Sequence, residues 1–153
     1  MTPHEYIQKW QGSTLNERQS YQAHFADLCA LVGVAAPSPA TLDHYCFERG
    51  VTKTGSRHGW ADVWMRGCFG FEYKAPDRSL DAALKQLMTY ALALENPPLL
   101  VVCDTQIIHI HTHFTNAPSE VHTIALQDIG LPADRRPSCT RASRMAQALQ
   151  RPI

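Results

Sequence analysis

The 153-residue sequence is 44% hydrophobic and 18% charged, which predicts one compact globular domain and excludes two full domains or a disordered chain. Its uninterrupted apolar runs are short, such as residues 99–103, and this excludes a membrane-spanning helix. The net charge is zero, but residues 1–130 carry nine Lys/Arg and thirteen Asp/Glu, a net −4, which disfavours autonomous binding to DNA phosphates.

Two helices are predicted in the N-terminal third of the chain. Residues 2–5, Thr-Pro-His-Glu, have the form of a capping box with proline at the first helical position, and predict a short helix over residues 3–11. A second capping box at residues 14–17 precedes apolar side chains at helical spacing. Gly33 is expected to end this second and longer helix.

Three strands are predicted in the middle of the chain. Residues 44–50 indicate a short strand, and the polar residues 51–59 indicate a surface loop. Residues 60–66 and 68–74 are two strand-like runs separated by Gly67, which predicts a β-hairpin.

A third helix follows this hairpin. Pro76 ends the second hairpin strand because proline has no N–H to donate to a ladder. Asp77 or Ser79 is expected to cap the helix, whose apolar face continues to Leu94, and residues 96–98, Asn-Pro-Pro, are expected to end it.

The remaining strands are predicted at residues 99–103, 106–114 and 120–126. The first of them is a continuous apolar run, typical of a strand that is buried on both faces beside a parallel neighbour. The order of elements predicts a mixed central β-sheet flanked by helices, an α/β or α+β fold. We expect residues 1–130 to form this domain and residues 131–153 to be a basic, irregular or weakly helical tail.

The hairpin carries the residues that predict chemistry. A turn centred on Gly67 places Asp62 directly opposite Glu72, and the alternation of side chains along a strand places Glu72 and Lys74 on one face. Opposed carboxylates repel, but a divalent cation between them removes the repulsion, and Mg²⁺ is typically held by one or two carboxylates. Lys74 is then placed to orient or activate water, or to stabilise charge on a phosphate.

This spacing resembles a known motif. Asp62, nine intervening residues and then Glu72-Tyr73-Lys74 are similar to the PD-(D/E)xK motif of a nuclease superfamily, with Ala61 in place of the proline. The resemblance implies an αβββαβ core, Mg²⁺ with Mn²⁺ as a substitute, Asp62 and Glu72 as metal ligands together with the Tyr73 carbonyl, and Lys74 as the residue that assists the attacking water.

Three further residues are candidates for this site. Gln86 and Tyr90 lie one turn apart on the third predicted helix, and are similar to the QxxxY motif of RecB-like nucleases, whose pair lies beside the catalytic centre. Glu48 is either an additional acid at the metal site, as upstream acids are in many of these nucleases, or an exposed charge at a strand end.

A narrower resemblance covers about residues 2–129. The separated segments that carry it are "TPHEYIQKW", "YCFERGVTKTG", "GWADVWMRGCFGFEYK", "LDAALKQLMTYALALENPPLLVV" and "IHTHFTNAPSEVH". They resemble, in order, the N-terminal endonuclease domain of MmeI-like restriction-modification enzymes, long chains that also contain an adenine methyltransferase and a target-recognition domain. No such further domain is present in the 153 residues.

The resemblance implies a Mg²⁺-dependent endonuclease of a restriction-modification or phage-defence system. Its expected partners are double-stranded DNA, a methyltransferase and target-recognition domain or subunit, and a second copy in a homodimer. The alternative is an inactive or accessory nuclease-fold module that works only with such a separate partner. A weaker alternative is a zinc protein built on the alternating histidines His109, His111 and His113, for which a polar strand face is the simpler interpretation.

The cysteines and the N-terminus favour a cytoplasmic protein. Five cysteines include no CxxC pair, which predicts free thiols in a reducing compartment and small buried side chains at Cys29, Cys68 and Cys103. The first ten residues lack a basic segment followed by an apolar one, so no secretory signal is expected.

Overall fold

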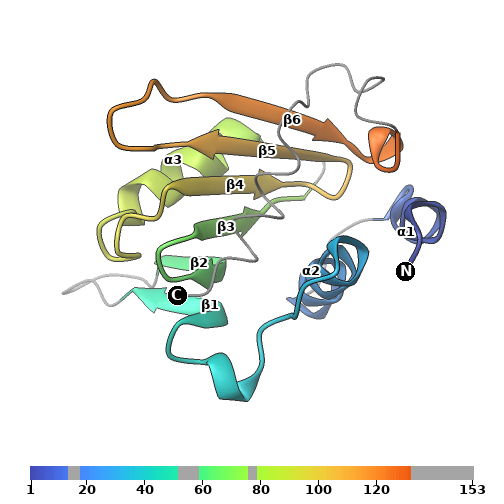
Figure 1. Ribbon diagram of the computed structural model, residues 1–153, viewed down its shortest axis with the longest axis horizontal. Helices are drawn as coiled ribbons and strands as arrows, with labels where there is room; N and C mark the ends of the chain where they lie inside the picture. Colours follow the sequence, from blue (N-terminus) through green and yellow to red (C-terminus); the bar gives the residue numbers. More distant parts are fainter. Residues whose placement is uncertain (14–17, 52–58, 76–78, 132–153) are drawn as a thin grey trace.

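The computed structural model describes residues 1–13, 18–51, 59–75 and 79–131 of the chain (Figure 1). Its helices are α1 (Pro3–Trp10), α2 (Arg18–Val32) and α3 (Leu80–Tyr90), with 3₁₀ turns at Pro39–Thr41 and Leu126–Asp128. Its strands are β1 (Tyr45–Val51), β2 (Gly59–Met65), β3 (Phe69–Tyr73), β4 (Leu99–Cys103), β5 (Ile107–Thr112) and β6 (Val121–Ala125). Most of the polar loop predicted over residues 51–59 lies outside the described residues, which include only its two end residues. The predicted basic tail also lies outside them, except for residue 131.

The described strands form one mixed sheet in the order β1-β2-β3-β4-β5-β6. β3 and β4 are parallel and α3 connects them, while the other neighbouring strands are antiparallel. The predicted mixed sheet of an α+β fold is therefore confirmed, and the succession α2, β1, β2, β3, α3, β4 has the αβββαβ order that the resemblance implied.

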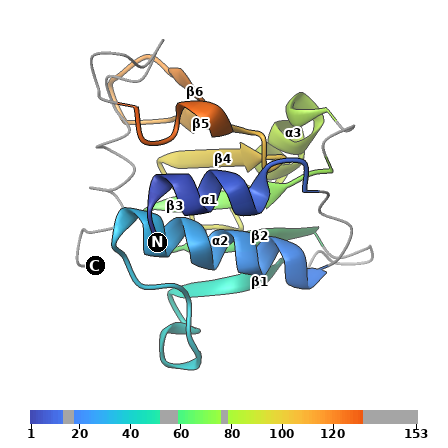
Figure 2. The same ribbon diagram turned by 90° about the vertical axis from the view of Figure 1, so that its right-hand side faces the viewer.

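The helices lie on opposite faces of the sheet, and each face has its own hydrophobic core. Figure 2 looks onto α1 and α2, which lie in front of the sheet. Under them pack aromatic side chains such as Tyr6, Phe25 and Phe71. On the other face, α3 contributes Leu87 and packs with Trp64 and neighbouring aliphatic side chains. β3 lies between the two cores, and all five of its residues are buried.

Local signals fix the helix starts as predicted. The Thr2 hydroxyl accepts a hydrogen bond from the Glu5 N–H, and the Glu5 carboxylate accepts one from the Thr2 N–H, so both halves of the capping box are present. Ser79 caps α3 by accepting from the Ala82 N–H. The second predicted box, at residues 14–17, and the alternative cap Asp77 lie outside the described residues.

The predicted end of α3 is wrong. The helix ends at Tyr90, four residues before Leu94. The next turns tighten through bonds such as Glu95 N–H to the Leu92 carbonyl, and Glu95 and Asn96 then have positive φ angles of 62° and 50°. The Leu94 carbonyl accepts a hydrogen bond from the Trp64 indole N–H, so a distant residue, and no longer the helix, satisfies this carbonyl.

Several other predictions are confirmed. β4 is buried along its whole length beside its parallel neighbour β3, and Gly67 turns the β2–β3 hairpin with a φ of +69°. The four cysteines that the structure describes, Cys29, Cys46, Cys68 and Cys103, are buried. Among the described helices, none has the length and apolar character needed to cross a bilayer.

Candidate active site

The hairpin register brings the predicted acids to neighbouring positions. Val63 of β2 pairs with Phe71 of β3. The next position on each strand is Asp62 and Glu72, so these two acids lie opposite each other, as a turn at Gly67 predicts. β1 pairs with β2 on either side of position 48, through Phe47 and Val63 and through Arg49 and Ala61, so Glu48 lies across from Asp62. Three acids therefore follow one another across three strands.

Asp62 ends the ladder between β2 and β3. Its Oδ2 accepts a hydrogen bond of 2.7 Å from the backbone N–H of Tyr73, in the place where a strand carbonyl would otherwise accept. A charge-assisted bond to a backbone N–H is short and strong. Asp62 is thereby tied to the residue between Glu72 and Lys74.

Glu72 is the buried acid of the site. Its residue is only 5% exposed, and its Oε1 accepts a hydrogen bond of 3.2 Å from the Gln86 amide. The Lys74 ammonium lies 3.6 Å from the same Oε1 and donates a bond of 3.1 Å to the Gln86 amide oxygen. Gln86 of α3 therefore connects the carboxylate of Glu72 with the ammonium of Lys74.

The second carboxylate oxygen of Glu72, Oε2, is buried and has no hydrogen-bond partner among the residues that the structure describes. Buried polar atoms are nearly always hydrogen-bonded, because an unsatisfied one costs about 1–3 kcal/mol. Burial and the negative charge of Asp62 together raise the pKa of Glu72 to about 8, against the opposing effect of Lys74. The site thus holds an acid that is unfavourable in its charged form unless a cation joins it.

A divalent cation fits this arrangement. The orphaned Glu72 oxygen and the adjacent Asp62 are hard oxygen ligands, and Mg²⁺ typically takes one or two carboxylates and completes its shell with carbonyl, water or phosphate oxygens. Within the described residues, no three His, Cys, Asp or Glu side chains gather into a metal cluster. This holds both for His109, His111 and His113 and for the three acids Glu48, Asp62 and Glu72, so the fit to a cation depends on the two carboxylates of Asp62 and Glu72.

Glu48 is held by the other helical layer. Its Oε1 accepts a 2.7 Å hydrogen bond from the Tyr21 hydroxyl of α2, and its side chain is half-buried rather than an exposed strand-end charge. Its φ is +56°, a left-handed conformation that is strained for a residue other than glycine. A strained acid beside Asp62 is compatible with the predicted role of an additional acid.

Tyr90 lies one turn beyond Gln86 on α3. It is partly buried and packs against the core on that face of the sheet. Its predicted role beside the catalytic centre stays a prediction.

Sequence reasoning missed a buried polar network on the opposite side of β3. His24 of α2 is fully buried, with Nε2 2.7 Å from the Tyr6 hydroxyl and Nδ1 2.7 Å from the Tyr73 hydroxyl. Burial lowers the pKa of His24 to about 4, so the ring is neutral at neutral pH. The signal in the sequence was a histidine three residues after Tyr21, on the apolar face of a predicted helix.

Comparison with known protein families places the chain in one of them. A family model described as "MmeI, N-terminal domain" matches residues 1–147. No curated protein and no solved structure matches the chain.

Proposed function

This chain belongs to the family of MmeI N-terminal domains, which gives it a restriction-modification-related role, and from that premise we propose that it is a Mg²⁺-dependent DNA endonuclease domain. The observation that carries the proposal is the buried Glu72 carboxylate, whose unpartnered oxygen lies in a site shared with Asp62 and Lys74. Groups whose environment disfavours their charged form cluster at functional sites.

Asp62 and Glu72 would hold the cation, with the Tyr73 carbonyl as a third oxygen and Glu48 as a further acid. When bound, Mg²⁺ supplies positive charge that polarises a phosphodiester and stabilises its transition state, and Mn²⁺ is expected to substitute. The tie from the Tyr73 N–H to Asp62 fixes one ligand, and the Gln86 amide fixes the other.

Lys74 would act on the attacking water or on the phosphate. Its ammonium is partly exposed and is oriented by the Gln86 amide oxygen, so its remaining protons can donate hydrogen bonds to a substrate phosphate. Donors that are already in place when charge develops in the transition state lower the barrier without reorganisation.

The test compares two lysine variants in cleavage of double-stranded DNA with Mg²⁺. Lys74→Ala is expected to lower the rate by about 10²-fold or more, the effect of losing one preorganised donor. Lys85→Ala, which removes the same charge from the exposed face of α3, is the matched control and should cut like wild type. Equal cleavage by Lys74→Ala and wild type, or a wild type that binds no divalent cation, would show the proposal to be wrong.

A second candidate is an accessory nuclease-fold module that works only with a separate methyltransferase and target-recognition partner. The net −4 charge of residues 1–130 favours it, because it opposes unassisted binding to DNA phosphates. A wild type that binds Mg²⁺ by calorimetry yet neither binds nor cuts DNA at low salt would favour this candidate over the first.

A further inference from the structure

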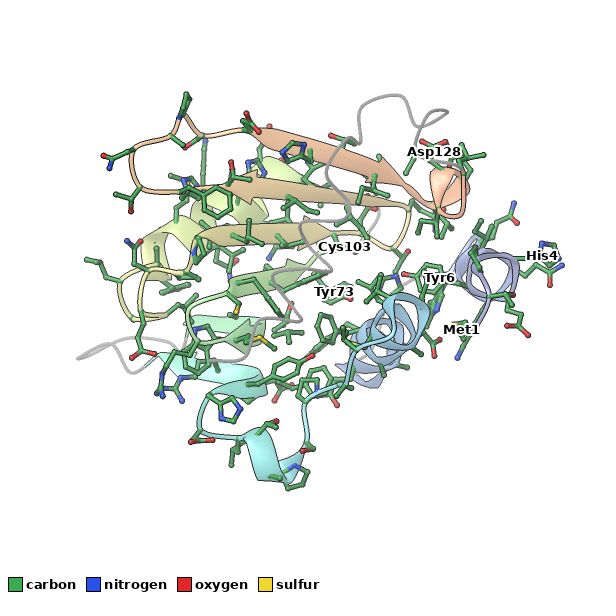
Figure 3. All side chains as sticks on the ribbon, viewed as in Figure 1. Met1, His4, Tyr6, Tyr73, Cys103 and Asp128 are labelled. Carbon is green, nitrogen blue, oxygen red and sulfur yellow. The ribbon has the colours of Figure 1, made fainter. Side chains whose placement is uncertain are left out.

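The network of Tyr6, His24 and Tyr73 spans from α1 through α2 to β3. Figure 3 labels Tyr6 on the helical side and Tyr73 on the sheet. Both ring nitrogens of the fully buried His24 are engaged at 2.7 Å. Aromatic packing confines the ring further, since Trp10 meets it edge-on with ring centroids 4.9 Å apart. The His24 ring is therefore contacted from α1, by Tyr6 and Trp10, and from β3, by Tyr73.

Tyr73 is the residue through which this network reaches the proposed active site. Its hydroxyl bonds to His24 on the helical side, while its backbone N–H bonds to Asp62. Its neighbours in the sequence are Glu72 and Lys74, whose side chains meet Gln86 of α3. A shift or rotation of Tyr73 would therefore move both acids and the lysine together.

The same face of α2 also restrains the upstream acid. Tyr21 precedes His24 by one helical turn and donates to Glu48. The Tyr21 and Tyr73 rings lie 5.5 Å apart, so the two contacts of α2 with the site pack against each other.

We propose that His24 is a positioning residue, which holds Tyr73 through the Nδ1 to hydroxyl hydrogen bond and thereby fixes Asp62, Glu72 and Lys74 in their relative positions. The inference rests on the proposed function of that site. Residues that orient metal ligands from behind typically contribute 10- to 100-fold to metal affinity or activity.

The test uses a matched pair of variants, Tyr73→Phe and Tyr6→Phe. Each removes one hydroxyl that bonds to one nitrogen of His24 at the same distance of 2.7 Å. A purely structural role for the network predicts similar consequences for the two variants. A positioning role predicts that only Tyr73→Phe changes the site, because Tyr6→Phe leaves the bond between His24 and Tyr73 in place.

The first measurement is amide hydrogen exchange in the metal-free protein. The rate of the Tyr73 amide, divided by that of the Phe71 amide two residues earlier on β3, reports local release of the bond to Asp62. We expect this ratio to rise about 10-fold in Tyr73→Phe, the lower end of the range for such partners, and to stay unchanged in Tyr6→Phe. If Tyr73→Phe does not fold, His24→Phe takes its place. This variant keeps a ring but removes both hydrogen bonds, and it should raise the exchange ratio by a similar factor.

The second measurement is Mg²⁺ affinity by calorimetry together with kcat for DNA cleavage. We expect Tyr73→Phe to weaken Mg²⁺ binding and lower kcat by about 10- to 100-fold, with KM for DNA little changed. An unchanged exchange ratio in Tyr73→Phe, or equal effects of the two variants on the ratio, would overturn the inference. A wild type without Mg²⁺ binding but with the expected exchange ratios would overturn the proposed function and leave the positioning role supported.

Discussion

The two sides of β3 both bury polar side chains, but they treat them differently. On the α1 and α2 side, the hydroxyls of Tyr6 and Tyr73 engage both nitrogens of His24, each at 2.7 Å. On the α3 side, one buried carboxylate oxygen of Glu72 has no partner among the described residues, and it lies beside the charge of Asp62. A satisfied buried network stabilises and orients, whereas an unsatisfied buried charge is a position where a ligand is expected.

The pKa shifts of His24 and Glu72 show the same contrast between the two sides of β3. The pKa of His24 is lowered, so the ring is neutral in its network, and the neutral ring is the form that burial favours. Glu72 has a raised pKa, so the fold disfavours the charged form that a metal ligand must have. Stability is given up on the α3 side, which is common at functional sites.

The largest effect is expected for Glu72→Gln. Replacing the proposed metal ligand with a neutral isostere should lower Mg²⁺-dependent cleavage about 10³-fold or more, since metal ions contribute several kcal/mol of transition-state stabilisation. The same variant should raise the melting temperature of the metal-free protein at pH 9, because the folded-state pKa of Glu72 is about 8 against an ordinary 4.5.

The sign follows from proton binding. Between pH 4.5 and 8 the folded state retains a proton on Glu72 that the unfolded state has lost, so stability falls as pH rises through that window. Melting curves of wild type and Glu72→Gln from pH 5 to pH 9 measure this. The exposed Glu95→Gln is the control, and a wild type that is at least as stable as Glu72→Gln at pH 9 would contradict the prediction.

The second prediction concerns the loss of stability at acid pH. The folded-state pKa of His24 is lowered from 6.5 to about 4, so its contribution is complete above pH 6.5 and is lost as pH falls through 4. We expect about 3 kcal/mol of this acid-side loss to come from His24, at about 1.4 kcal/mol per pKa unit.

Urea unfolding at pH 7 and pH 4.5 of wild type and His24→Phe is the measurement. The difference between the two pH values should shrink in His24→Phe, although the variant is less stable at pH 7. His4→Phe, which changes the exposed histidine of α1, should keep the wild-type difference. If His24→Phe keeps it too, the network does not hold a neutral histidine.

The third prediction tests the bridge from α3 to the site. Gln86→Leu removes the amide that bonds to both Glu72 and Lys74. We expect a loss of about 10-fold in cleavage, or 1.4 kcal/mol, because the ligand and the lysine stay in place but are less well oriented. Thr89→Ala, whose exposed hydroxyl bonds only within α3, should cut at the wild-type rate. A Gln86→Leu variant as active as Thr89→Ala would remove Gln86 from the site.

The smallest effect is expected away from β3. Arg66 and Glu95 form a 2.8 Å ion pair in which both side chains are about half exposed. Exposed pairs of this kind contribute about 0–1 kcal/mol. Glu95→Ala should therefore lower the free energy of unfolding by less than about 1 kcal/mol, measured with urea at 0.15 M salt. A larger loss would mean that charges at the surface of this protein matter as much as those beside β3.

The sequence by itself determined the local features. The capping box at Thr2, the turn at Gly67 and the apolar run of β4 depend on neighbouring residues, so their outcomes were predictable. The register across Gly67 also followed from the sequence, because a tight turn fixes which residues lie opposite each other. This placed Asp62 across from Glu72, and the spacing of Lys74 and Gln86 supplied the rest of the candidate site.

Only the tertiary structure decided the features that depend on burial and on distant residues. The turns after Tyr90 are held in part by Trp64, far away in the sequence, whose indole N–H donates to the Leu94 carbonyl. His24 gains its role from Tyr6 and Tyr73, which are brought to it by α1 and β3. The orphaned oxygen of Glu72 is likewise a property of packing, since whether a carboxylate is buried without a partner is set by what surrounds it in space and not by its neighbours in the chain.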